Sequence, residues 1–74
     1  MATEKEFLKQ LGKKIANCRR KKNLSQTQLG DLVDMERSSV ARLETGNSNA
    51  TSLTLLKIGR ALDVPVKKLF EFDL

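Results

Sequence analysis

The sequence predicts an all-α protein of five short helices that forms one domain over residues 1–74. Two observations support this fold class. Apolar residues recur at spacings of three and four, which is the period of one helix face. Ser and Thr residues that can cap a helix stand where these apolar patterns begin. A chain of 74 residues leaves no room for a second domain, and its core must be thin.

The first helix is expected to begin after Thr3 and to end near Lys22. The Thr3 hydroxyl can cap the first turn, and Glu6 completes a capping box. Its apolar residues share one face: Phe7, Leu8, Leu11, Ile15 and Cys18. The basic run from Arg19 to Lys22 complements the negative end of the helix dipole, so it needs no separate targeting or membrane role.

A second capping box, formed by Ser25 and Gln28, predicts a helix that starts at Gln26 and stops near Asp34. Asp tolerates the left-handed conformation that a stop requires. Because Gly30 lets another backbone approach closely, we expect a tight helix crossing there. The apolar face of this helix is expected to consist of Leu29, Leu32 and Val33.

The third helix is expected from Arg37 to about Thr45, with Gly46 closing it at a positive φ. At 100° per residue, one arc faces the protein and comprises Val40, Leu43 and Glu44. The opposite arc looks outward. Its residues are Arg37, Ser38, Ala41, Arg42 and Thr45.

Two further helices are expected, one from Ser52 to Leu62 after a Thr51 cap and a short one from Pro65 to about Phe70. The core of the longer one is expected to come from Leu53, Leu56, Ile58 and Leu62.

The charge balance favours a nucleic-acid partner. Fourteen Lys and Arg against nine Asp and Glu give a net charge of +5, which attracts polyanions. The chain has no Trp or Tyr and its three Phe lie near its ends, so it lacks the stacking platform of single-strand binders. Double-stranded DNA is therefore the expected partner.

Several other classes of function are not expected. With the single Cys18 and no His, the chain lacks the usual zinc ligands, so no metal or other cofactor is predicted. No small-molecule site, Gly-rich phosphate loop or activated nucleophile is evident, which argues against an enzyme. The absence of a long apolar run and of a signal pattern predicts a cytoplasmic protein without membrane contact.

The second and third helices, joined by a tight turn, are typical of a helix-turn-helix. The sequence resembles the phage-repressor-like (Xre-type) family, which includes the 434 and lambda repressors and Cro. In length it resembles the stand-alone controller proteins of restriction-modification operons. The resemblance covers about Leu11 to Phe70. It rests on Leu24-Ser25-Gln26, Leu29-Gly30, Val40, Arg42-Leu43-Glu44, Gly46 and Leu53 through Leu62.

This resemblance implies a five-helix lambda-repressor-like DNA-binding domain whose third helix enters the major groove. We expect Arg37, Ser38, Ala41 and Arg42 to contact bases, because Arg donates two bonds to guanine and Ser suits either base type. Glu36 stands where the family usually has a small capping hydroxyl residue. It either accepts from a cytosine amino group or weakens binding by repelling phosphates, and both interpretations stay open.

Phosphate contacts are expected from the start of the second helix and from the far edge of the third. By resemblance, Gln26 is the first candidate. Short polar residues supply the others, although each could simply be solvated: Ser39, Thr45, Asn47, Ser48 and Asn49. The resemblance also pairs Arg19 with Glu44 in a structural salt bridge.

We expect a homodimer, since one recognition helix reaches only a few base pairs. Its interface is expected at an apolar C-terminal cluster: Val66, Leu69, Phe70, Phe72 and Leu74. In the alternative, Leu69 and Phe70 close the core while the last residues fray. The predicted function is sequence-specific transcriptional regulation, as a repressor or activator, on a palindromic operator. The alternative is an antitoxin-like protein-interaction module that also binds DNA.

Overall fold

The computed structural model describes residues 3–74, so the first two residues of the expected domain lie outside it. Within that range the chain forms helices and no strand, which confirms the all-α class. The elements are α1 (Glu4–Lys21), α2 (Gln26–Val33), α3 (Arg37–Glu44), α4 (Ser52–Ala61) and the 3₁₀ helix η1 (Val66–Phe70).

The fifth helix is not an α-helix, which corrects the expected count of five. In η1 the amides of Lys68 and Glu71 donate to the carbonyls three residues earlier, of Pro65 and Lys68. A segment this short gains little from the α-helical pattern, and a 3₁₀ turn is the common solution. No helix within residues 3–74 combines the length and the apolar character that crossing a membrane requires.

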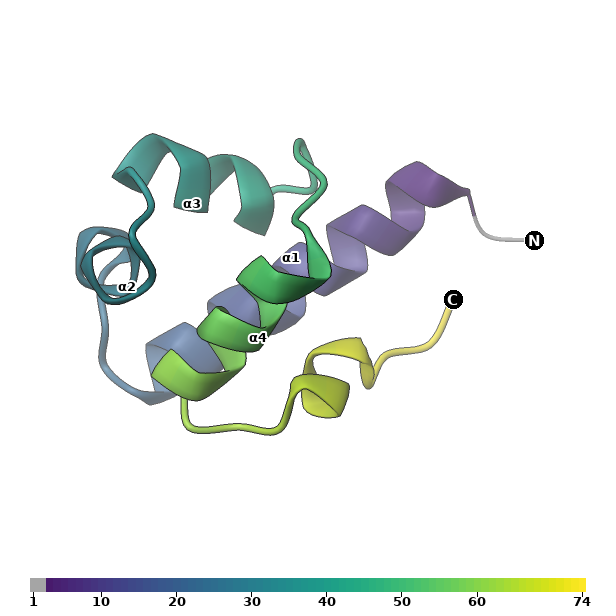
Figure 1. Cartoon of the computed structure of the whole chain (residues 1–74). Coiled ribbons are helices and arrows are strands. Elements are labelled where there is room, and N and C mark those ends of the chain that lie inside the picture. Colours follow the sequence, from purple (N-terminus) through teal and green to yellow (C-terminus); the bar gives the residue numbers. More distant parts are fainter. Residues whose placement is uncertain (1–2) are drawn as a thin grey trace.

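The helices surround one small core (Figure 1). The long α1 runs through the molecule, α3 packs on both α1 and α2, and α4 packs on α2 and η1. The largest fully buried side chains come from every element: Ile15, Leu29, Val40, Ile58, Leu62 and Leu69. The side of α3 that faces away from α1 and α2, with Arg37, Ser38 and Arg42, is left exposed to solvent.

The helix ends follow the capping signals in the sequence. Thr3 with Glu6 and Ser25 with Gln28 both form complete capping boxes. The Thr51 hydroxyl accepts from the Thr54 amide, 3.2 Å away, at the start of α4. These caps satisfy amides that a helix start leaves without a partner.

The turn between α2 and α3 depends on left-handed backbone. Asp34 closes α2 at φ 57°, and Gly46 follows α3 at φ 80°, as the sequence predicts. Gly30 does not lie at a helix crossing, however. A Cβ there would clash with the carbonyl oxygen of Met35, because the turn folds back over α2. The tight crossing is at Gly12, where an added Cβ would lie 2.5 Å from carbonyl oxygens of α3.

Two leucines expected in the core are exposed instead. Leu32 in α2 and Leu53 in α4 are each 60% exposed. The buried apolar side chains are Leu55 and Ile58 in α4 and Leu62 at its C-cap, a spacing that turns Leu53 to the opposite side. Ile58 and Leu62 are buried as expected and Leu56 is half-buried, so the error is the choice of Leu53 in place of Leu55.

Candidate nucleic-acid interface

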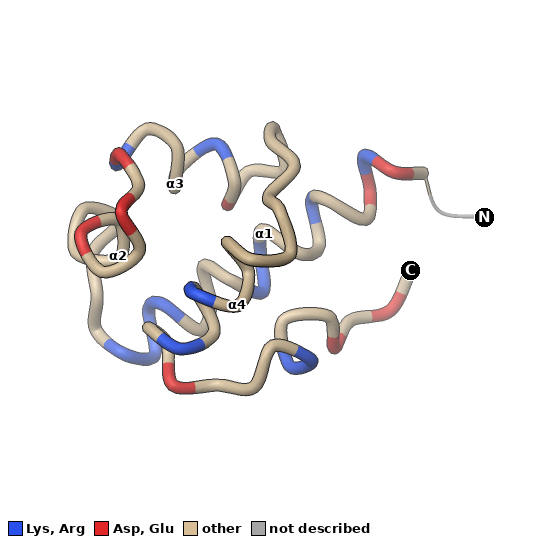
Figure 2. Tube along the Cα trace, viewed as in Figure 1, with Lys and Arg blue, Asp and Glu red and all other residues tan. Residues whose placement is uncertain are grey.

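The two arcs of α3 differ sharply in exposure. Val40 and Leu43 are almost fully buried, whereas Arg37, Ser38 and Arg42 are exposed. Figure 2 shows basic residues on the α3 trace at an edge of the molecule, where no other helix covers them. Ala41, between these residues, is half-buried. This surface can therefore meet a groove without any rearrangement of the fold.

A buried ion pair holds α3 from behind. The Arg19 Nε donates to Glu44 Oε2 at 2.7 Å, and an Nη donates to Oε1 at 3.0 Å. The other Nη donates to the Leu24 carbonyl at 2.8 Å. The hydrogen bonds to Glu44 raise the pKa of Arg19 above its ordinary value, so the guanidinium stays charged throughout the physiological range. A two-pronged pair of this kind fixes orientation as well as distance.

Gln26 joins the same network from the start of α2. Its Nε2 donates to Glu44 Oε1 at 3.0 Å, so the side chain is held close to the end of α3. No buried side-chain polar atom within residues 3–74 lacks a partner. A phosphate contact by Gln26 remains a prediction, and its second amide hydrogen is the side-chain donor left to make it.

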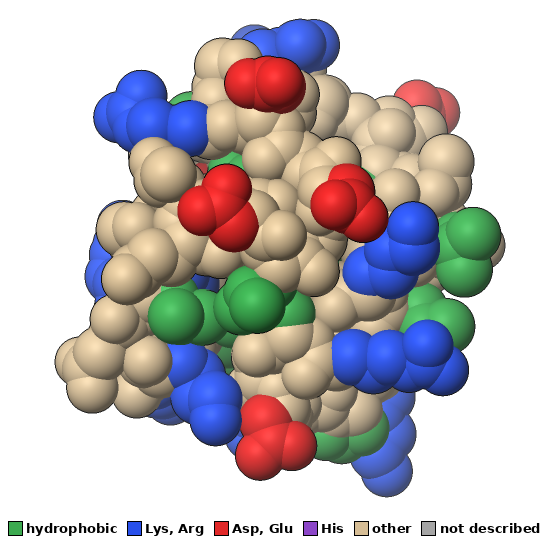
Figure 3. All heavy atoms as spheres, turned by 60° about the vertical axis from the view of Figure 1, so that its left-hand side comes forward, with side chains coloured by type: hydrophobic (Ala, Val, Ile, Leu, Met, Phe, Trp, Pro, Cys, Tyr) green, Lys and Arg blue, Asp and Glu red, His purple; other side chains and the backbone are tan. Residues whose placement is uncertain are grey.

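Glu36 occupies the N-cap position of α3 but makes no side-chain cap hydrogen bond. It is exposed, as are Asp31 and Asp34 in the elements just before it. Figure 3 shows the side of the molecule on which α2 lies, where acidic side chains stand close to exposed hydrophobic ones. The exposed side of α3, which carries Arg37, Ser38 and Arg42, is thus bordered by negative charge at its N-terminal end.

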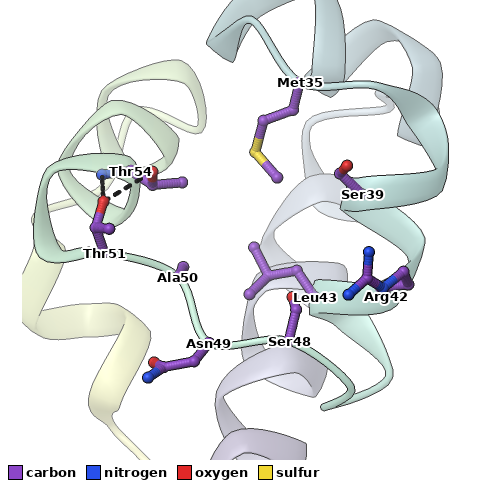
Figure 4. A pocket seen from close by; sticks show the side chains of 9 residues that line it. All are labelled: Met35, Ser39, Arg42, Leu43, Ser48, Asn49, Ala50, Thr51 and Thr54. Atoms are coloured by element: carbon purple, nitrogen blue, oxygen red, sulfur yellow. Dashed lines mark hydrogen bonds between the residues drawn. The ribbon is translucent and has the colours of Figure 1, made fainter.

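A pocket of about 230 Å³ lies between α3 and the start of α4 (Figure 4). Ser39 and Arg42 line it from α3, and Ser48 and Asn49 line it from the following loop. The loop thus brings short polar groups next to an arginine, which suits a sugar-phosphate strand. The remaining lining residues are Met35, Leu43, Ala50, Thr51 and Thr54.

Five residues that line the pocket were not among the predicted contact residues: Met35, Leu43, Ala50, Thr51 and Thr54. Nothing in their spacing indicates a shared pocket, because the pocket arises from the way the loop returns beside α3. Thr45 and Asn47 do not line this pocket; the Asn47 Nδ2 donates to the Thr45 hydroxyl oxygen at 2.9 Å. The Thr45 hydroxyl donates its one hydrogen to the Ala41 carbonyl at 3.0 Å, so it closes α3, and the predicted phosphate contact would require this hydroxyl to give up that bond.

The sequence model of the helix-turn-helix family HTH_3 matches residues 15–69 of the chain. The chain belongs to this family. The match includes α2, the turn, the recognition helix α3, α4 and most of η1. A comparison with curated proteins gave no match.

Several solved structures share this fold. The restriction-modification controller protein C.AhdI from Aeromonas hydrophila is 35% identical over 85% of this chain and 96% of its own, with a TM-score of 0.83. An HTH_3 family transcriptional regulator from Vibrio cholerae is 26% identical over 92% of this chain, at a TM-score of 0.83. The match covers only 38% of the Vibrio protein. The clp gene regulator ClgR from Corynebacterium glutamicum shares the fold, with a TM-score of 0.83. It is 21% identical over 85% of this chain and 67% of its own.

The C-terminal apolar cluster of this helix-turn-helix domain is only partly available to a partner. Leu69 is fully buried in the core, so its expected place in a dimer interface is wrong. Phe70 is 39% exposed and Leu74 is 62% exposed. Val66 and Phe72 are half-buried. The aromatic rings form a small cluster, because Phe7 stacks on Phe70 and meets Phe72 edge-on.

Replacing Glu44 by Ala leaves the buried Arg19 charge without its anionic partner, so we expect a loss of about 3–5 kcal/mol in the free energy of unfolding, measured with urea. Arg19→Lys keeps the charge but not the two-pronged geometry, and it should lose less. Lys22→Ala is the matched control, since it breaks an exposed pair with Asp63, 3.8 Å apart. That change should cost under about 1 kcal/mol. Equal losses for the Glu44 and Lys22 variants would contradict the role of the buried pair.

Proposed function

We propose that this protein is a sequence-specific transcriptional regulator that binds double-stranded DNA as a homodimer on a palindromic operator. The observation that carries the proposal is the free outer side of α3. It presents Arg37, Ser38 and Arg42 to solvent while the buried pair of Arg19 and Glu44 holds the helix from behind.

The chemistry of these side chains supports base recognition. A guanidinium donates two bonds to guanine O6 and N7, and a serine hydroxyl serves as donor or acceptor. The Ala41 methyl group lies between them and suits a thymine methyl. The net charge of +5 adds attraction to DNA of any sequence. Membership in the HTH_3 family and the regulator named among its relatives support the same function.

A homodimer is proposed because α3 has only eight residues, and one such helix spans a few base pairs. A second copy related by a two-fold axis would double the contacts and would produce a palindromic site. The exposed parts of Phe70 and Leu74, with the half-buried Val66 and Phe72, are the proposed interface. The protein is further proposed to act in the cytoplasm, without catalysis and without a metal or other cofactor.

Arg42→Ala is expected to weaken binding to the operator by about 1–3 kcal/mol, because the bonds to one base are lost. Binding to unrelated duplexes should persist. Fluorescence anisotropy with an operator enriched from random duplexes, at one stated salt concentration, measures both affinities. Arg60→Ala, which removes an exposed arginine from α4, is the matched control for charge. Equal operator binding by the Arg42 variant and the parent would rule out Arg42 as a base contact.

Sedimentation equilibrium at tens of micromolar protein is expected to show a dimer, and Phe70→Asp should shift it to monomer by placing a charge in the apolar contact. Leu53→Asp is the control, since Leu53 is also exposed but lies on α4. Circular dichroism confirms that both variants are folded. A parent that is only monomeric would contradict the dimer. Co-purification of a different polypeptide through the tail would instead favour the interaction module.

A further inference from the structure

The carboxylate of Glu36 is unengaged at a place where a helix usually has a capping side chain. Thr3, Ser25 and Thr51 each accept a backbone hydrogen bond at the N-cap of α1, α2 and α4, whereas Glu36 makes none at α3. Within residues 3–74 no ion pair or side-chain hydrogen bond involves this carboxylate. It therefore contributes no cap to the stability of the recognition helix.

The backbone of Glu36 is nevertheless well fixed. Its carbonyl accepts from the amides of Ser39 and Val40 at 3.0 and 3.1 Å, and its backbone is extended at φ −65° and ψ 149°. The side chain is exposed and starts at the N-terminal end of α3, directly before Arg37. In a helix-turn-helix this end of the recognition helix contacts base edges. The carboxylate is consequently carried toward the groove floor together with Arg37.

Only some base edges can receive a carboxylate. In the major groove, guanine presents only acceptors, and thymine presents an acceptor and a methyl group. Neither base can donate a hydrogen bond to the Glu36 carboxylate. Adenine has an amino donor, but its N7 acceptor lies beside that donor. Cytosine presents its N4 amino group without a neighbouring acceptor on the same base. Cytosine is therefore the base that Glu36 fits best.

The neighbouring charges match one base pair. In a C·G pair the cytosine offers a donor to Glu36, and guanine O6 and N7 offer two acceptors to an arginine such as Arg37. Two adjacent residues of opposite charge thus complement the two bases of a C·G pair or of neighbouring pairs. If Glu36 did no more than repel phosphates, its position directly before Arg37 would have no role in reading the base pair.

We propose that Glu36 is a specificity-determining residue that selects cytosine at one position of each operator half-site by accepting a hydrogen bond from its N4 amino group. This proposal rests on the proposed function as a DNA-binding regulator. A bidentate contact discriminates roughly 5- to 150-fold between bases, and the single bond from N4 to Glu36 is expected near the lower end of that range.

Enrichment of random duplexes on the parent and on Glu36→Gln and Glu36→Ala tests the proposal. The parent should enrich a palindrome with cytosine at one symmetric pair of positions. Gln pairs with adenine N6 and N7, so Glu36→Gln should change that preference from cytosine to adenine. Glu36→Ala should lose the preference at those positions alone. Because Glu36 is exposed and makes no cap, both variants are expected to fold like the parent, which thermal melting checks.

Asp31→Asn is the matched control, because it removes one exposed negative charge from α2 and should leave the enriched sequence unchanged. Identical enriched sequences for the parent and both Glu36 variants, with uniformly tighter binding by the variants, would overturn the proposal and show simple repulsion of phosphates. If the parent enriched no sequence at all, the proposed function would fail and the Glu36 proposal would fail with it. A parent palindrome that both variants retain defeats the Glu36 proposal alone.

Discussion

The buried pair of Arg19 and Glu44 is the interaction on which the position of the recognition helix depends. It joins the end of α1 to the end of α3, and the bond from Gln26 to Glu44 adds the start of α2. Two charges with little exposure are costly unless their hydrogen-bonding groups are satisfied. Here the guanidinium has both Glu44 oxygens and the Leu24 carbonyl as partners. Three helices are thereby fixed relative to one another by a single network of side chains.

Close backbone packing adds to this constraint. At Gly12 the carbonyl oxygens of Leu43 and Glu44 leave no space for a Cβ, so α1 and α3 cross in direct contact. A similarly close contact joins the turn to α2, where the Met35 carbonyl packs over Gly30. Because its inner side is occupied by the pair and by the contact with Gly12, α3 directs its remaining side chains outward. The surface proposed to read DNA is therefore the side of α3 that the fold does not use.

The sequence predicted most of the local structure and less of the packing. Capping residues mark helix starts through bonds to amides three residues away, so Thr3, Ser25 and Thr51 were sufficient to place α1, α2 and α4. Which leucines of α4 are buried depends on the neighbours of that helix, and the choice of Leu53 over Leu55 was wrong. A glycine indicates that another part of the backbone can approach closely, but the sequence does not identify which segment approaches it. For this reason the crossing at Gly12 was missed and the one at Gly30 was misplaced.

The candidate site was predicted in part. The partnership of Arg19 and Glu44 came from the family resemblance, since no spacing rule relates residues 25 positions apart. The pocket beside Arg42 depends on the path of the loop after Gly46, which the sequence does not specify. We propose that the outer side of α3 and this loop together form the DNA-binding surface. Backbone amide chemical shifts of isotope-labelled protein, titrated with its enriched duplex, test that claim most directly. We predict the largest changes in α3, at the start of α2 and in the loop before α4; changes concentrated on the end of α4 and η1, with α3 unaffected, would contradict it.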